Sequence, residues 1–169
     1  MKTRAAASER VLLFTVEKAR FALPLENVER VVRAVAVTPL PGAPEAVVGV
    51  IDVHGMITPV FDVRRRLGFP ESEIEPENSF VLAWSAGRLV ALVVEAVGDV
   101  IELSADEVIE TDAVAEHAAV IDGILKLRDG LALVQDLDEF LSAEEKQRLA
   151  QALEPRELEP LSRATPEAG

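Results

Sequence analysis

The stretch that decides the fold is GVIDVHGMITPVFDVRRRLG, from Gly49 to Gly68. It alternates apolar and polar residues, turns at His54-Gly55, alternates again, and changes period at Asp62. An alternation with a period of two is typical of a half-buried β-strand, and two such runs joined by a two-residue turn are typical of a hairpin. The stretch therefore predicts a β-hairpin that leads into a short helical turn.

The composition of the chain limits the kinds of protein it can be. It has 169 residues, of which 49% are apolar, enough to build a sizeable core in one domain or two very small ones. Its net charge of -13 disfavours nucleic acids and anionic membrane surfaces as partners. The absence of cysteine excludes disulfides and thiolate metal sites. No segment reads as a secretion signal or a membrane span, so we expect a cytoplasmic protein.

Short apolar runs that are rich in β-branched residues recur through most of the chain and are separated by regular turns. The predicted strands are 11–16, 20–25, 28–37, 47–53, 56–61, 80–84, 89–94 and 97–103. A helix would instead need a period of 3.6 residues over ten or more positions. The sequence therefore predicts an all-β body.

The two halves of the chain resemble each other in three places. ALPLENVERV from Ala22 aligns with ALVVEAVGDV from Ala91, a shift of 69 residues. VVGVIDVHG and VIDGILKLRDG align through the glycines at 49 and 123, and PVFDVRRRL and LVQDLDEFL align Asp62 with Asp136, both with a shift of 74. Three matches in the same order favour a duplicated unit. We interpret the units, at about 11–68 and 80–141, as two small barrels in tandem, since closure removes the edges of a sheet.

Asp62 and Asp136 stand where a strand gives way to a helical turn in each repeat. Aspartate is among the strongest helix N-cap residues, so the position predicts two structural caps rather than two catalytic acids. The basic triplet Arg64, Arg65 and Arg66 is either an anion site or a solvated turn that complements a helix dipole, and we favour the solvated turn.

No pattern of residues points to catalysis. His54 and His117 lie in different repeats and lack a second metal ligand at helical or strand spacing, although carboxylates from across the fold could still complete a site. Asp52 shares a strand face with His54, or else His54 is an ordinary turn residue. Ser85 precedes what reads as a plain hairpin turn, and no nucleophile or phosphate-binding motif is present. We predict a protein that is not an enzyme and that holds no metal or cofactor.

The C-terminal part of the chain predicts one helix and a tail. Ser142 and Glu145 have the spacing of a capping box, which starts a helix at 143–153 that Pro155 ends. Residues 155–169 are expected to be a disordered tail, and residues 1–10 a flexible N-terminus.

An ordered string of motifs carries a resemblance to a known family. FTVEKARFALPLENVERVV, VVGVIDVHGMITPVFDVRRRLGF, ALVVEAVGDVIEL and LALVQDLDEFL, between about Val11 and Leu141, resemble the CheW family of chemotaxis coupling proteins. The resemblance implies an all-β fold of two tandem five-stranded SH3-like barrels packed side by side, with short helical turns and a C-terminal helix. It also implies a noncatalytic adaptor that couples the cytoplasmic tips of chemoreceptors to the regulatory domain of a CheA-type histidine kinase.

The chain departs from the family pattern at two positions. The family usually has an acidic residue where this chain has Arg30, and an arginine where it has His54; in the family these two positions are associated with receptor contact and with each other. The resemblance therefore implies partner-binding roles for Val28, Arg30, Gly49, His54 and Gly55. We expect Arg30 and His54 to face one groove, with His54 neutral beside the arginine.

Three functions remain open at this point. The first is a coupling adaptor in a chemotaxis array or a related chemosensory pathway. The second is a CheW-like scaffold or competitor with altered partners, and the third is a small-ligand or metal-dependent enzyme built on barrels. The sequence leaves open which kinase and which receptor are involved, and whether the free protein is a monomer.

Overall fold

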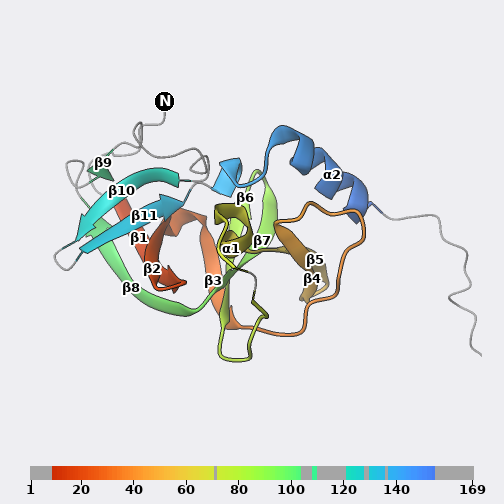
Figure 1. The fold of residues 1–169 in the computed structure, drawn as a ribbon, viewed down its shortest axis with the longest axis horizontal. Coiled ribbons are helices and arrows are strands. Elements are labelled where there is room, and N and C mark those ends of the chain that lie inside the picture. The colour runs from red at the N-terminus through yellow and green to blue at the C-terminus, as the bar shows by residue number, and fades with distance from the viewer. Residues whose placement is uncertain are drawn as a thin grey trace, which may run out of the picture.

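The computed structural model describes residues 9–70, 72–103, 108–109, 121–127, 130–135 and 137–154. Most of the regular structure is β, in two sheets that lie side by side (Figure 1). Barrel A has the strand order β8-β1-β2-β11-β10-β9, and barrel B has the order β3-β6-β7-β5-β4. The strands of barrel A are β1 (Glu9–Val16), β2 (Ala19–Pro24), β8 (Ala96–Leu103), β9 (Val108–Ile109), β10 (Ile121–Leu127) and β11 (Gly130–Gln135). Those of barrel B are β3 (Val28–Arg33), β4 (Val47–Val53), β5 (Met56–Phe61), β6 (Ser79–Ser85) and β7 (Arg88–Val94).

The all-β prediction is confirmed, but the predicted boundaries of the barrels are wrong. Strands β1 and β2 do not pair with the rest of the segment 11–68; they pair with β8 and β11. Strands β6 and β7 in turn pair with β3 and β5. The reason is that the chain crosses to barrel B through the 3-10 helix η1 (Leu25–Asn27) and crosses back after β7. Barrel A also has six strands rather than five, because the short β9 pairs with β10.

The register of the strands nevertheless follows the repeat found in the sequence. Ala22 lies opposite Val134 where β2 and β11 run parallel, and Ala91 lies opposite Val60 where β7 and β5 run parallel. These two pairs are related by the shifts of 69 and 74 residues. The bulge between Val47 and Gly49 likewise recurs 74 residues later in β10. Each repeat thus gives strands to both barrels, at equivalent places.

Barrel B closes where the chain beyond β3 meets β4, because β3 and β4 are the two edges of its sheet. Thr38 and Val50 exchange two backbone hydrogen bonds, of 2.9 and 2.8 Å. This contact brings the two backbones so close that a Cβ on Gly49 would lie 2.2 Å from the carbonyl oxygen of Thr38. The closure of the barrel therefore requires glycine at position 49.

The two barrels share one apolar core. It includes the stacked rings of Phe14 and Phe21 from barrel A, and Phe61 of β5, whose ring stacks on Phe140 at a centroid distance of 4.6 Å. A second cluster, which contains Phe80, fills the interior of barrel B. The packing of the barrels side by side is as predicted.

Two helices follow the predicted caps. Helix α1 (Val63–Leu67) begins after Asp62, whose Oδ1 accepts a hydrogen bond from the backbone N of Arg64 at 3.0 Å. Helix α2 (Ala143–Leu153) has the predicted capping box, in which Ser142 and Glu145 bind each other's backbone N–H. Both predictions are confirmed.

Several predicted features fall outside the described residues. These are the cap at Asp136, the isolated His117, most of the N-terminal segment and the tail 155–169. Of the predicted N-terminal segment, Glu9 and Arg10 belong to β1. Within the described part of the chain, no helix has the length and apolar character needed to cross a membrane.

Candidate functional site

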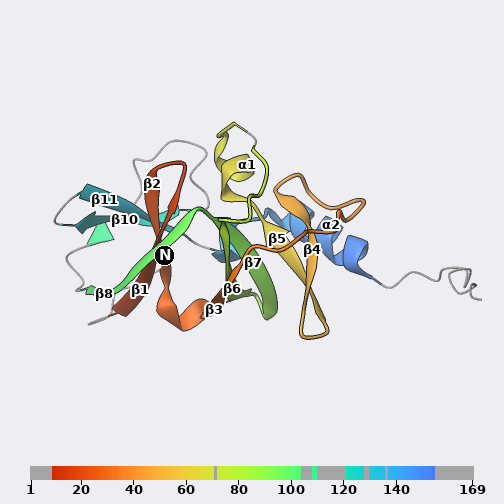
Figure 2. The ribbon, with the colours of Figure 1, turned by 90° about the horizontal axis from the view of Figure 1, so that it is seen from below.

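One end of barrel B gathers exposed polar and apolar side chains. The β4–β5 turn, the β6–β7 turn and the start of β3 all lie at this end, because β5 runs parallel to β7 and β3 runs antiparallel to β6. The β4–β5 turn and α1 are at opposite sides of the molecule (Figure 2). We call this end the mouth of barrel B and define it by Glu29, Arg30, His54, Met56 and Trp84.

The hairpin turn at the mouth has a local cause. His54 and Gly55 both have positive φ angles, of 50° and 87°, as a type I′ turn requires. Asp52 stabilises the turn because its Oδ1 accepts a hydrogen bond from the backbone N of Gly55 at 2.7 Å. The turn directs the ring of His54 toward β3.

Arg30 and His54 meet across the two edges of the sheet, as the sequence predicted. Nη2 of Arg30 lies 3.1 Å from Nε2 of His54. A guanidinium can only donate hydrogen bonds, so Nε2 must accept, and the ring is neutral with its proton on Nδ1. Both side chains are exposed, which leaves them open to a partner.

Trp84 is a candidate site residue that the sequence analysis missed. Its Nε1 donates a hydrogen bond of 2.9 Å to Oε1 of Glu29, the residue before Arg30. The side chains of Trp84 and Met56 are 39% and 47% exposed, which is unusual for residues of this size. A signal was available, since Trp84 is the sole tryptophan and directly precedes the turn at Ser85-Ala86-Gly87.

The five predicted partner-binding residues do not lie together. Arg30, His54 and Gly55 are at the mouth. Val28 packs partly against the shared core, and Gly49 is buried beneath Thr38. The positions of Val28 and Gly49 are therefore explained by packing and by barrel closure.

The prediction of a solvated basic turn is wrong for Arg64. Its side chain is buried, and Nε and Nη2 donate to Oδ1 and Oδ2 of Asp62 at 3.0 and 3.1 Å. Nη1 also donates to Ser72. Burial alone would lower the pKa of Arg64, but the hydrogen bonds and charge of Asp62, with the charges of Glu17 and Glu95, raise the pKa above its ordinary value. Because α1 lies between the barrels (Figure 1), one side of this short helix faces protein rather than water.

The other two arginines of the triplet also hold α1 in place. Arg65 donates to the backbone oxygen of Glu45 at 2.7 Å. Arg66 pairs with Glu145 of α2 at 2.5 Å, and its guanidinium lies 5.7 Å from the centre of the Phe140 ring. The triplet joins α1 to three different parts of the fold and is not a free anion site.

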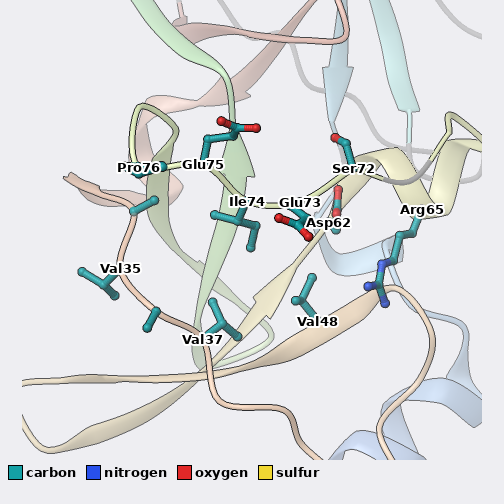
Figure 3. Close-up of a pocket in the computed structure, with 12 residues that line it drawn as sticks. Val35, Val37, Val48, Asp62, Arg65, Ser72, Glu73, Ile74, Glu75 and Pro76 are labelled. Atoms are coloured by element: carbon teal, nitrogen blue, oxygen red, sulfur yellow. The ribbon is translucent and has the colours of Figure 1, made fainter.

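A bowl with a volume of about 660 Å³ opens on the side of barrel B (Figure 3). Val37, Val48 and Ile74 form apolar parts of its wall, and Glu73 and Glu75 stand at its border. Asp62 and Arg65 also line the bowl, but each is bound elsewhere as described above. Within the described residues, no group of three or more His, Cys, Asp or Glu side chains is placed to hold a metal ion. The bowl therefore offers a surface for binding and no evident group for catalysis.

Comparison with known proteins agrees with this picture. The profile of the CheW-like domain matches residues 10–145, which is most of the chain. The chain belongs to the CheW-like domain family. The chemotaxis protein CheW of Bacillus subtilis (strain 168) is 28% identical to this CheW-like chain over 149 residues, which are 87% of this chain and 96% of the relative. Chemotaxis protein CheW of Rhizobium meliloti (strain 1021) is 27% identical over 139 residues, covering 81% and 90% of the two chains.

The solved structures include a CheW with the same fold. The crystal structure of the scaffolding protein TtCheW from Thermoanaerobacter tengcongensis superposes with a TM-score of 0.75 at 24% identity, covering 81% of this chain and 94% of that one. Protein FrzA of Myxococcus xanthus is a further relative, 28% identical over 121 residues, or 69% of this chain and 76% of FrzA. The CheW-like chain is thus a coupling adaptor of chemotaxis or a related chemosensory pathway, built from two SH3-like barrels.

Proposed function

We propose that this chain acts in the cytoplasm, binds the regulatory domain of a CheA-type histidine kinase and the cytoplasmic tip of a chemoreceptor, and catalyses no reaction itself. The family supports a role in holding proteins together. The surface supports it as well, because the mouth of barrel B exposes large apolar side chains beside polar ones. Interfaces that bind other proteins have this mixture of apolar anchors and a polar rim.

The observation that carries the receptor proposal is the contact between Arg30 and His54 at 3.1 Å. Both residues stand at positions where the CheW family resemblance implies receptor contact. The contact also joins the edges of the sheet, so a purely structural role must be separated from binding by experiment. An arginine where the family has an acid reverses the charge, and we infer that the receptor tip presents a carboxylate there.

The experiment restores the family pattern in the variant Arg30→Glu/His54→Arg. Titration calorimetry should show weaker binding to the native receptor tip and stronger binding to a conventional one, by about tenfold in each case. The two single variants should be nonadditive, because the side chains touch. Unchanged affinity for both receptor tips, measured at low and moderate salt, would reject the mouth as the receptor surface.

The altered charge also favours a second function, that of a CheW-like scaffold or competitor with other partners. The same titrations distinguish it from the adaptor. A competitor would bind the kinase regulatory domain and fail to bind either receptor tip. The adaptor must bind both partners at once, which a three-component sedimentation experiment would detect.

A further inference from the structure

A second, smaller cavity lies between the β6–β7 turn and the C-terminal helix. Its volume is about 190 Å³. We call it the α2 pocket. Its apolar wall consists of Phe61, Val90, Leu137, Leu141 and Leu149. Its rim consists of Ser85, Ala86, Arg88 and Lys146.

The walls of the α2 pocket are held in place from several sides. Asp138, next to the wall residue Leu137, accepts hydrogen bonds of 3.2 Å from Oγ of Ser85 and the backbone N of Ala86. On the other side, the ion pair between Arg66 and Glu145 fixes the start of α2. The pocket is therefore formed before any partner arrives, and a partner does not bear the cost of ordering it.

The charge at the rim is opposite to the charge of the whole chain. Arg88 and Lys146 are the charged residues that line the pocket, and both are exposed. Neither has a hydrogen bond or an ion pair within the described residues. The nearby carboxylates of Asp138 and Glu145 are bound to Ser85 and Arg66. In a chain with a net charge of -13, two unpaired cations beside an apolar cavity favour a partner that carries carboxylates.

We propose that the α2 pocket binds a partner protein by taking up one apolar side chain that is flanked by carboxylates. An apolar cavity of about 150 Å³ is large enough for benzene, so about 190 Å³ suffices for one phenyl or leucine side chain. Pockets that hold whole small molecules are usually larger, about 300 to 1,000 Å³, which favours a protein segment as the occupant. A single buried anchor surrounded by polar contacts is also how interaction hot spots are built. This inference does not depend on where the receptor binds.

The test uses two short blocked peptides and the full chain. One peptide has phenylalanine between two aspartates, and the other has phenylalanine between two lysines. Methyl NMR spectra should show shifts at Val90 and Leu149 with the aspartate peptide, at an affinity at least about tenfold higher than with the lysine peptide. Reversal of the rim charge, in Arg88→Glu/Lys146→Glu, should reverse this preference.

The matched control is Arg33→Glu/Arg148→Glu, which changes the net charge equally at exposed positions that do not line the pocket. This control should keep the preference for the aspartate peptide. Equal binding of both peptides, or shifts that spare Val90 and Leu149, would overturn the proposal. So would binding of 3-phenylpropanoate alone as tightly as the aspartate peptide, because this would make the occupant a small molecule. None of these outcomes bears on the receptor titrations, which change Arg30 and His54.

Discussion

Two arginines of this molecule make close contacts of opposite kinds. Arg64 is buried between the barrels and binds both carboxylate oxygens of Asp62, whereas Arg30 lies at an exposed mouth and binds the neutral ring of His54. The buried charge has lost its water and depends on a complete set of partners. The exposed one keeps its water and can exchange the histidine for a partner's carboxylate at little cost. The comparison teaches that exposure to water decides which arginine maintains the fold and which is available for recognition.

The largest expected effect is at the buried contact. Asp62→Ala removes the cap of α1 and also leaves the charge of Arg64 buried and unpaired. Loss of an N-cap typically costs about 0.5 to 2 kcal/mol, and breaking a buried ion pair costs more, so we expect a loss of about 3 kcal/mol in the free energy of unfolding. Urea denaturation of the wild type and the variant measures this loss.

Asp62→Asn separates the two roles of Asp62, since asparagine caps helices well but carries no charge. It should retain the cap and still lose most of the stability that Asp62→Ala loses. Adding Arg64→Met should recover part of the loss, because the unpaired charge is then gone. An Asp62→Asn protein as stable as the wild type would show that the ion pair contributes nothing.

A smaller loss is expected at Gly49, where packing rather than charge is tested. Gly49→Ala must move the backbone of Thr38 away from the added methyl group, at a cost of about 1 to 3 kcal/mol. The matched control is Gly98→Ala in β8, where the added carbon would meet its nearest neighbour at 3.4 Å. Thermal melts of the two variants should differ clearly, and equal melting temperatures would contradict the close approach of Thr38 and β4.

The ion pair between Arg66 and Glu145 is half-buried and gives a pH-dependent prediction. Burial would raise the pKa of Glu145, but hydrogen bonds from Ser142 and the contact with Arg66 outweigh it and lower the pKa. A carboxylate with a lowered pKa stabilises the fold above its ordinary pKa, and this contribution is lost as pH falls through the lowered value. Glu145→Gln should therefore be less stable than the wild type at pH 7, with the difference vanishing in strong acid. A difference that is constant with pH would exclude the ion pair as its cause.

The smallest effect on stability is expected at the mouth. His54→Asn keeps the positive φ of the turn, because asparagine favours type I′ turns, but removes the ring that binds Arg30. We expect a change within about 0.5 kcal/mol, as for other exposed polar pairs, together with weaker binding to the native receptor tip. A large loss of stability with unchanged binding would make the contact a structural latch of the barrel.

The sequence predicted the caps, the repeat and the contact between Arg30 and His54 because each depends on local or pairwise chemistry. Asp62 and Ser142 are caps by virtue of their immediate neighbours. The apolar alternation of 47–61 specifies a hairpin wherever the hairpin is placed. The family resemblance supplied the pairing of positions 30 and 54.

What the sequence did not predict depends on which strands meet in space. A repeat does not say whether its strands pair within a unit or between units, so the boundaries at 68 and 80 were misplaced. The burial of Arg64 was missed for the same reason, since it follows from the position of α1 between the barrels. Trp84 became a site residue only when β3 placed Glu29 beside it.

The exchange of strands between the barrels has a consequence for how the chain is made. All the strands of barrel B come from one continuous segment, 28–94, so this barrel can close as soon as that segment has left the ribosome. Barrel A must wait, because β1 and β2 lack their neighbours until β8 and β11 have been synthesised. Contacts between such distant segments form slowly. During this interval the N-terminal hairpin exposes unpaired strand edges, and it is the part of the newborn chain most in need of protection from aggregation.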